Sequence, residues 1–221
     1  MKTLTRKWIA FCVLGMAAIL FAPAAQAATL RQSLAHLQNK WAVVNYRMTS
    51  KAQQERAITA LAAQAARLAR AYPRRAEPLI LQANILCTKA GIENDISSLD
   101  EIEKARALLL RAEKINPRAL DGAAYAYLGW LYHKLPGWPI AFGDDEQAER
   151  YLKKAIALAP NGRDSNFYYG NFLYEEGHYA EAKAALERSL RARARPLAAL
   201  ADAERRKEAA SLLRQVDKKL L

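Results

Sequence analysis

The stretch NFYYGNFLYEEGHYAEAKAALERSL, residues 166–190, decides the fold of this chain. Its apolar residues recur at helical spacing on both sides of Gly177, which predicts two helices joined by a tight turn. Gly177 can adopt the left-handed backbone that ends the first helix. Gly170 and Ala182 lack bulk, so two antiparallel helices can approach closely there. Three larger side chains are expected to fill the space on either side, namely Tyr169, Leu173 and Leu186.

The same pattern recurs twice toward the N-terminus. AYAYLGWLYHK (124–134) and QAERYLKKAIALAP (147–160) form one copy, and PLILQANILCTK (78–89) and EIEKARALLLRAEKINP (101–117) form the other. The distance from the small residue of the first helix to the alanine of the second is 12 residues in the last copy, 19 in the middle copy and 21 in the first. Two copies therefore have expanded turns, with seven extra residues in LPGWPIAFGDD (135–145) and nine in 90–99.

Residues 77–196 resemble the tetratricopeptide repeat (TPR) family. Tyr169-Gly170 and Leu128-Gly129 match its Leu-Gly pair, Tyr179 follows the turn glycine, and Pro196 lies near the closing proline. The resemblance implies a right-handed all-α solenoid of about three helical hairpins with a concave groove that binds partner peptides or helices. The organisation of the whole chain also resembles exported bacterial TPR-type proteins, which are distantly similar to the T component of some TRAP transporters.

The remainder of the chain also predicts helix, because it is rich in Ala, Leu, Arg, Lys and Glu and has no alternating β-branched runs. One helix is expected over 30–47, and a second begins after Ser50, which we expect to cap it, and ends before Pro73. These N-terminal helices occupy 28–76. A last helix over 197–221 is expected to cap the open end of the array.

The first 27 residues predict a secretory signal peptide, because Lys2, Arg6 and Lys7 precede an apolar run that ends in an A-x-A site before Ala28. The apolar run from Trp8 to Phe21 is too short for a membrane span, so the mature chain is expected in the periplasm with no membrane span. Cleavage would lower the net charge from +12 to +9, which fits an anionic partner or simply a soluble surface. Cys87 would remain as the single thiol, and we expect it to be buried and inert.

Aromatic residues are concentrated in the middle and last repeats, with 13 of the 19 between Tyr125 and Tyr179. We expect most of them in the core, among them Tyr125, Tyr132, Tyr169 and Phe172. The resemblance to TPR proteins places six other side chains in the concave groove: Trp130, His133, Asp164, Phe167, Asn171 and Tyr174. An aromatic wall with a few polar groups suits a peptide side chain or an apolar or anionic small ligand.

The loop LPGWPIAFGDD allows two interpretations. Trp138 and Phe142 form either a lid over the groove or a plug that packs onto the helix edge. Asp144 and Asp145 are expected to cap the helix that follows. The basic series Arg188, Arg191, Arg193 and Arg195 either contacts an acidic partner or a lipid headgroup, or places cations near a helix C-terminus.

No residue set predicts an enzyme, a cofactor site or a metal site. His36, His133 and His178 lie in different elements, and the metal-binding and nucleotide-binding motifs are absent. Glu175 and Glu176 beside His178 are expected to face solvent, and nucleic acid is disfavoured by export. Two functions remain: a non-catalytic adaptor that binds an envelope protein or peptide in its groove, or a small-ligand receptor that serves a solute transporter.

Overall fold

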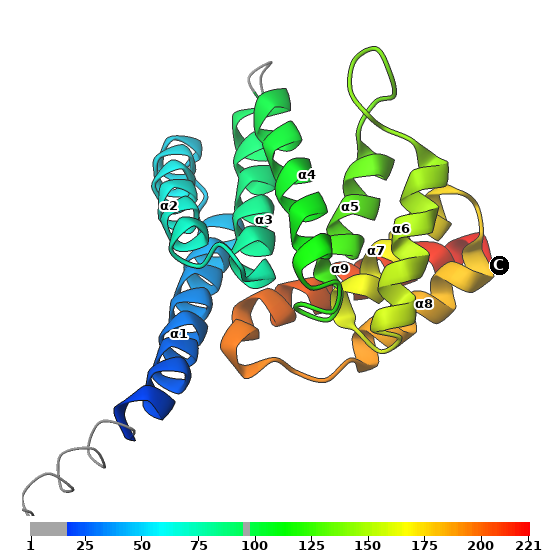
Figure 1. Ribbon diagram of the computed structural model, residues 1–221. Coiled ribbons are helices and arrows are strands. Elements are labelled where there is room, and N and C mark those ends of the chain that lie inside the picture. Colours follow the sequence, from blue (N-terminus) through cyan, green and yellow to red (C-terminus); the bar gives the residue numbers. More distant parts are fainter. Residues whose placement is uncertain (1–16, 95–97) are drawn as a thin grey trace, which may run out of the picture.

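The computed structural model describes residues 17–94 and 98–221, with side chains from residue 27 onward. Most of the predicted signal peptide therefore lies outside the described residues. The described part is all-α with no β-strand, which confirms the predicted fold class (Figure 1). Among these residues, no helix combines the length and the apolar character needed to cross a membrane.

The described helices follow one another in antiparallel order (Figure 1). Their bounds are α1 Ala17–Arg47, α2 Lys51–Ala71, α3 Ala76–Glu93, α4 Ser98–Ile115, α5 Ala123–Lys134, α6 Asp145–Leu158, α7 Arg163–Glu175, α8 Tyr179–Arg191, the short 3₁₀ helix η1 Pro196–Ala198 and α9 Ala199–Lys219. Helices α3 and α4, α5 and α6, and α7 and α8 pack as three hairpins in a solenoid-like array.

Small residues set the distance between the helices of a hairpin. A Cβ added at Gly129 would lie 2.6 Å from Cγ of Leu152, and one added at Gly170 would lie 2.9 Å from Cγ of Leu186. Gly177 has φ +79° at the turn of the last hairpin. The close approach and the left-handed turn therefore occur where the sequence pattern predicts them.

The helix ends agree only in part with the capping residues and turn lengths predicted from the sequence. Ser50 occupies the N-cap position of α2, but its side chain makes no capping hydrogen bond. Asp144 does cap α6, because its carboxylate accepts a hydrogen bond of 2.9 Å from the backbone N–H of Gln147. The predicted expanded turn over 90–99 is shorter than expected, since α3 continues to Glu93 and α4 begins at Ser98. Most of those extra residues therefore lengthen the two helices.

Candidate functional site

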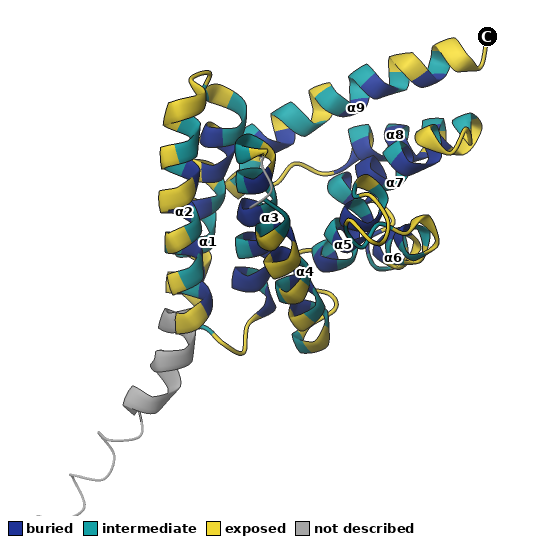
Figure 2. Ribbon diagram, turned by 90° about the horizontal axis from the view of Figure 1, so that it is seen from above, coloured by how far each residue is buried: buried dark blue, intermediate teal, exposed yellow. Residues whose placement is uncertain are grey.

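The C-terminal helix α9 lies across the inner side of the helical array. It packs against α7 and α8, as a terminal cap would, and it also contacts α1 (Figure 2). Arg47 of α1 and Glu204 of α9 form an ion pair of 3.0 Å. Arg205 donates to the Tyr168 hydroxyl at 2.9 Å and lies 4.3 Å from the ring centre of Phe167. The last helix therefore covers the part of the groove that α7 would otherwise expose.

The five helices α1, α3, α5, α7 and α9 surround a central cavity of about 310 Å³. Its wall is largely aromatic, and its lining residues are Trp41, Asn45, Tyr46, Asn84, Cys87, Thr88, Tyr127, Trp130, Leu131, Tyr168, Arg205 and Glu208. Trp41 Nε1 donates to Thr88 Oγ1 at 2.7 Å. The Asn84 Nδ2 amide is buried and has no hydrogen-bond partner among the described residues. A buried amide without a partner is costly, so a ligand acceptor in this cavity would be stabilised there.

A second hollow, which we call the outer pocket, opens beside the central cavity and has a volume of about 470 Å³. Its lining comes from α1, α3, α5, α7 and η1: Ala27, Leu30, Arg31, Leu34, Ala35, Gln38, Arg75, Glu77, Leu81, Leu120, Ala123, Tyr127, Asp164, Arg195, Leu197 and Ala198. Tyr127 lines both hollows. Both volumes fall in the range of pockets that bind small molecules or peptide side chains.

Leu120 gives the outer pocket an exposed apolar edge. Leu120 lies in the connection between α4 and α5 and is 51% exposed. Its φ is +48°. Asp121 and Gly122 continue the left-handed backbone with φ +57° and +71°. A branched residue in this conformation is uncommon, and such strain is concentrated at ligand clamps and active sites.

The rim of the outer pocket carries mixed charge with a surplus of arginine. Arg75 pairs with Glu77 at 2.7 Å, and Arg195 pairs with Asp164 at 2.7 Å. Arg31 has no ion-pair partner among the residues that the structure describes. The outer pocket therefore offers one uncompensated cation beside apolar walls.

Asp164 connects the outer pocket to α9. Its carboxylate accepts from Arg195 at 2.7 Å and from Arg205 at 3.2 Å. Burial alone would raise the pKa of this carboxyl, but the charges and hydrogen bonds of the two arginines outweigh burial and hold the pKa below its ordinary value. Asp164 therefore stays ionised and serves as an anchor for η1 and α9.

Burial keeps three side chains of the central cavity protonated near neutral pH. Burial raises the pKa of the Cys87 thiol to about 12. Burial also raises the pKa of the Tyr127 hydroxyl and raises that of Tyr168 well above its ordinary range. These groups stay protonated under ordinary conditions, so they can donate hydrogen bonds but do not act as bases.

The structure does not bring the six predicted groove residues together on one open surface. Trp130 lines the central cavity, and Asp164 lines the outer pocket. Phe167 is only 7% exposed beneath Arg205 of α9. Asn171 has a buried Oδ1 without a partner among the described residues. His133 and Tyr174 lie toward the other end of α5 and α7, where Tyr174 contacts the ring of Tyr179.

His133 forms a small polar cluster at the start of α6. Its Nδ1 lies 2.9 Å from Asp145 Oδ1, and its Nε2 lies 3.0 Å from Glu175 Oε2, while Lys134 pairs with the same glutamate. Ligand atoms of His133, Asp145 and Glu176 lie within 4.8 Å of one another, so their geometry could hold a metal ion. No sequence motif predicts this cluster of three side chains, because they come from α5, α6 and the turn after α7.

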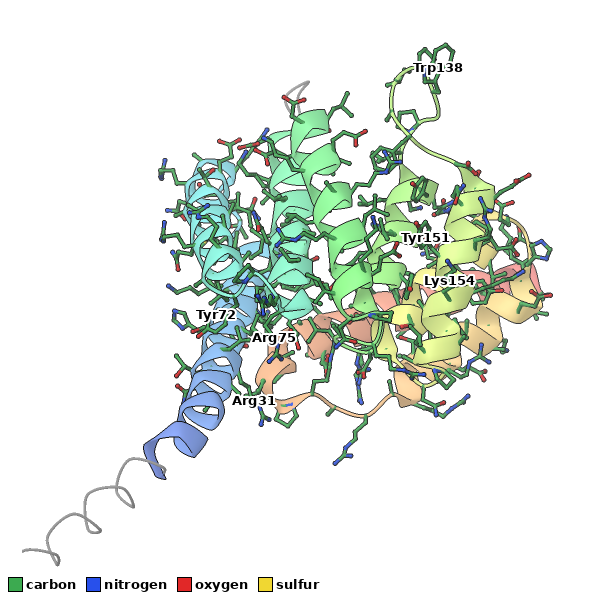
Figure 3. All side chains as sticks on the ribbon, viewed as in Figure 1. Arg31, Tyr72, Arg75, Trp138, Tyr151 and Lys154 are labelled. Carbon is green, nitrogen blue, oxygen red and sulfur yellow. The ribbon has the colours of Figure 1, made fainter. Side chains whose placement is uncertain are left out.

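Trp138, in the loop over 135–144, forms neither a lid nor a plug. Trp138 is at its outer end, 90% exposed, and points away from the helices (Figure 3). Phe142 instead packs at the base, with its ring centre 5.2 Å from that of Tyr132 and 4.3 Å from the guanidinium of Arg106. No residue of the loop lines the central cavity or the outer pocket.

Three of the four arginines of the predicted basic patch have partners within the chain. Arg195 pairs with Asp164 and Asp202, Arg188 donates to Asn166 at 2.9 Å, and Arg191 pairs with Glu187. Arg193 has no side-chain partner among the described residues.

Arg188 and Arg191 lie in the last turn of α8, as the second interpretation of the basic series predicts, and a third arginine contacts the end of this helix. Arg163, which is buried, donates to the carbonyls of Ser189 at 3.1 Å and Ala192 at 2.7 Å. This contact satisfies helix-end carbonyls that would otherwise lack a partner.

Sequence reasoning missed Trp41, Tyr168 and Arg205, which line the central cavity, and Tyr127, which lines both hollows. The aromatic residues were visible as part of a dense aromatic region, but their direction depends on where α1 and α9 dock. No family model matches the sequence, and no curated protein matches it at a significant level.

Proposed function

We propose that this protein is a non-catalytic TPR-like adaptor of the bacterial envelope, exported by its N-terminal signal segment, that binds an apolar segment of a partner protein in the outer pocket. The observation that carries the proposal is the outer pocket itself: an open hollow of about 470 Å³ with apolar walls and an unpaired arginine. Repeat arrays of paired helices commonly bind partners on their inner side.

The chemistry of the outer pocket specifies the kind of segment that it would bind. Leu30, Leu34 and Leu81 form the walls and Leu120 the exposed edge, so apolar side chains gain by leaving water there. Arg31 adds a cation at the same place, which favours an acidic side chain or a terminal carboxylate beside the apolar residues.

Filling the outer pocket tests this proposal. Ala35→Phe adds a ring inside the pocket, whereas Ala63→Phe adds the same ring on the exposed face of α2 as a matched control. A photo-crosslinking amino acid at position 120, at the pocket edge, would report on occupancy in the periplasm. We expect crosslinked partners in the otherwise unchanged chain and in the Ala63→Phe variant, and their loss in the Ala35→Phe variant. The same adducts in all three proteins would contradict partner binding in this pocket.

The second candidate, a small-ligand receptor associated with a solute transporter, is favoured by the central cavity. Its aromatic wall and the unpaired Asn84 amide suit a planar ligand with a hydrogen-bond acceptor. A thermal-shift screen of aromatic carboxylates and amides tests it, because a ligand of the folded state raises stability with the logarithm of its concentration. We expect a shift in the natural chain that is lost in Asn84→Leu. The absence of any shift across the screen would eliminate this candidate.

A further inference from the structure

The outer end of the loop over 135–144, which we call the Trp138 loop, presents apolar side chains to solvent. Trp138 is 90% exposed and Ile140 is 66% exposed. Figure 3 shows Trp138 beyond the ends of the neighbouring helices. A large aromatic and a branched aliphatic side chain on one exposed tip are typical of an element that inserts into an apolar pocket.

The base of the Trp138 loop is held in place. Gly143 N–H donates to Pro136 C=O at 2.9 Å, and Asp144 N–H donates to Tyr132 C=O at 2.8 Å. A side chain at Gly143 would collide with the Leu135 carbonyl, so the two ends of the loop cross closely. Phe142 anchors the base against Tyr132. The tip is therefore presented by a braced base, which lowers the conformational entropy lost on binding.

Carboxylates are concentrated at the base of the Trp138 loop, although the chain as a whole has a net charge of +12. Asp144 ends the loop, Asp145 and Glu146 follow it, and all three are exposed. Two nearby cations have partners, since Lys134 pairs with Glu175 and Arg106 pairs with Glu103. An apolar tip with carboxylates at its base favours an apolar pocket with a cationic rim over an anionic lipid surface.

The chain itself carries a pocket of that kind at its opposite end. The outer pocket has apolar walls and is lined by Arg31, Arg75 and Arg195, with two carboxylates in partial compensation. Arg74 and Arg193 line the hollows that adjoin it and share residues with it. Figure 3 shows Arg31 and Arg75 near the end of the molecule opposite Trp138. A pocket of about 470 Å³ has room for an indole and a neighbouring aliphatic side chain.

We propose that the Trp138 loop of one copy of this chain inserts into the outer pocket of a second copy. The contact is heterologous, because the two surfaces differ, so assembly continues head to tail unless a ring closes. The proposal rests on the proposed function in one respect: the second copy occupies the same pocket as the partner segment and competes with it.

Three variants, one in the loop and two in the pocket, test the contact. Trp138→Ala removes the inserted side chain, and Ala35→Phe fills the pocket; Arg31→Glu reverses the rim charge at an exposed position as a second pocket variant. Sedimentation velocity of the exported protein from about 1 to about 500 µM would measure assembly. We expect concentration-dependent oligomers for the natural chain and for the control Ala63→Phe. Each test variant should weaken assembly by about 30-fold or more, as loss of a central anchor does.

Mixing the two kinds of variant gives the decisive result. The Trp138→Ala chain keeps an open pocket and the Ala35→Phe chain keeps an intact loop, so an equimolar mixture should form a 1:1 complex that grows no further. A natural chain that stays monomeric up to the highest concentration would overturn the proposal. So would a Trp138→Ala chain that assembles normally, or a mixture without a complex.

The same variants separate this proposal from partner binding. Trp138→Ala should weaken self-assembly and leave crosslinking of envelope partners from position 120 unchanged or stronger. If self-assembly is absent and those partners are still captured, this proposal fails and the proposed function stands. If self-assembly is present and no other partner is captured, the proposed function fails and the contact between two copies stands.

Discussion

The two expanded turns of this protein have similar lengths and opposite outcomes. Relative to the last hairpin, the first hairpin has nine extra residues and the middle hairpin has seven. In the first, α3 extends to Glu93 and α4 begins at Ser98, so the additional residues mainly prolong two helices. In the middle hairpin, α5 ends at Lys134 and α6 begins at Asp145, so the additional residues form the Trp138 loop.

The difference is explained by residues that a helix does not tolerate. Pro136 and Pro139 lack the N–H that a helix needs, and each would cost about 3 kcal/mol inside one. The first expanded turn has no proline, so its helices continue and make contacts: Ala90 is buried, and Lys89 bridges Glu93 at 2.7 Å and Glu101 at 3.2 Å. One insertion therefore adds stability, whereas the other adds an exposed surface.

Shortening each turn gives the largest expected contrast. Deleting residues 91–99 removes the end of α3, the start of α4 and the Lys89–Glu93 ion pair, so the free energy of unfolding should fall by about 3–5 kcal/mol. Deleting residues 137–141 removes only the outer end of the Trp138 loop and should cost about 1 kcal/mol or less. Urea denaturation measures both. An equal fall in the free energy of unfolding for both deletions would show that the two insertions contribute equally to stability.

Glycine-to-alanine substitutions probe the two turns at single positions. A Cβ at Gly143 would collide with the Leu135 carbonyl, so Gly143→Ala should lower the free energy of unfolding by about 1–3 kcal/mol. Gly91 lies in α3, and a Cβ added there would meet no atom within 4 Å. Gly91→Ala should therefore raise the free energy of unfolding by up to about 1 kcal/mol. Thermal and urea unfolding would show the opposite signs; destabilisation by both would contradict this interpretation.

Within the Trp138 loop, the two aromatic residues should behave differently. Phe142→Ala removes the contacts with Tyr132 and Arg106 and should cost about 1–2 kcal/mol. Trp138→Ala should change stability by less than about 0.5 kcal/mol, because the side chain is exposed. A greater loss for Trp138→Ala, measured by urea unfolding, would mean that the indole packs on the molecule.

The smallest effect concerns pH and the ion pairs of the first expanded turn. Burial lowers the pKa of the Lys89 ammonium, but hydrogen bonds and charges of Glu93 and Glu101 outweigh it and raise the pKa above 10.5. The stabilisation is therefore complete below pH 10.5 and is lost as the pH rises through the raised value. The melting temperature of the natural chain should exceed that of Lys89→Gln at pH 8, and the gap should close as the pH rises through the raised pKa of Lys89, above 10.5.

A control for that experiment is Lys40→Gln, at an exposed position of α1 without an ion pair among the described residues. Its difference from the natural chain should stay constant over the same pH range. A gap for Lys89→Gln that does not close would assign the effect to packing of the lysine stem.

Much of the fold followed from local patterns. The all-α class is confirmed, and the glycines at 129, 170 and 177 lie where close helix contact or a left-handed turn requires them. Asp144 caps α6 as predicted. Ser50 has the right position but no side-chain cap, and the first expanded turn is shorter than predicted because α3 and α4 continue into it.

The candidate site was less predictable. Groove positions assigned by the resemblance assume that the inner side stays open, but α9 covers Phe167, and Arg195 before η1 and Arg205 of α9 pair with Asp164. Trp130 is the one aromatic residue of the predicted groove that lines a cavity. The direction of Trp138 could not follow from sequence, because a proline-rich loop can fold back or project with the same residues.

By itself, the sequence determined the helices, the hairpin turns and the position of the Trp138 loop, because these depend on spacing and on glycine and proline within short segments. Only the tertiary structure decided that α9 crosses the inner side, that two hollows remain and that the loop tip projects. These features depend on pairs far apart along the chain: Arg205 and Asp164 are separated by 41 positions, and Trp41 and Thr88 by 47. No local pattern encodes such contacts, since they form only when the helices have docked.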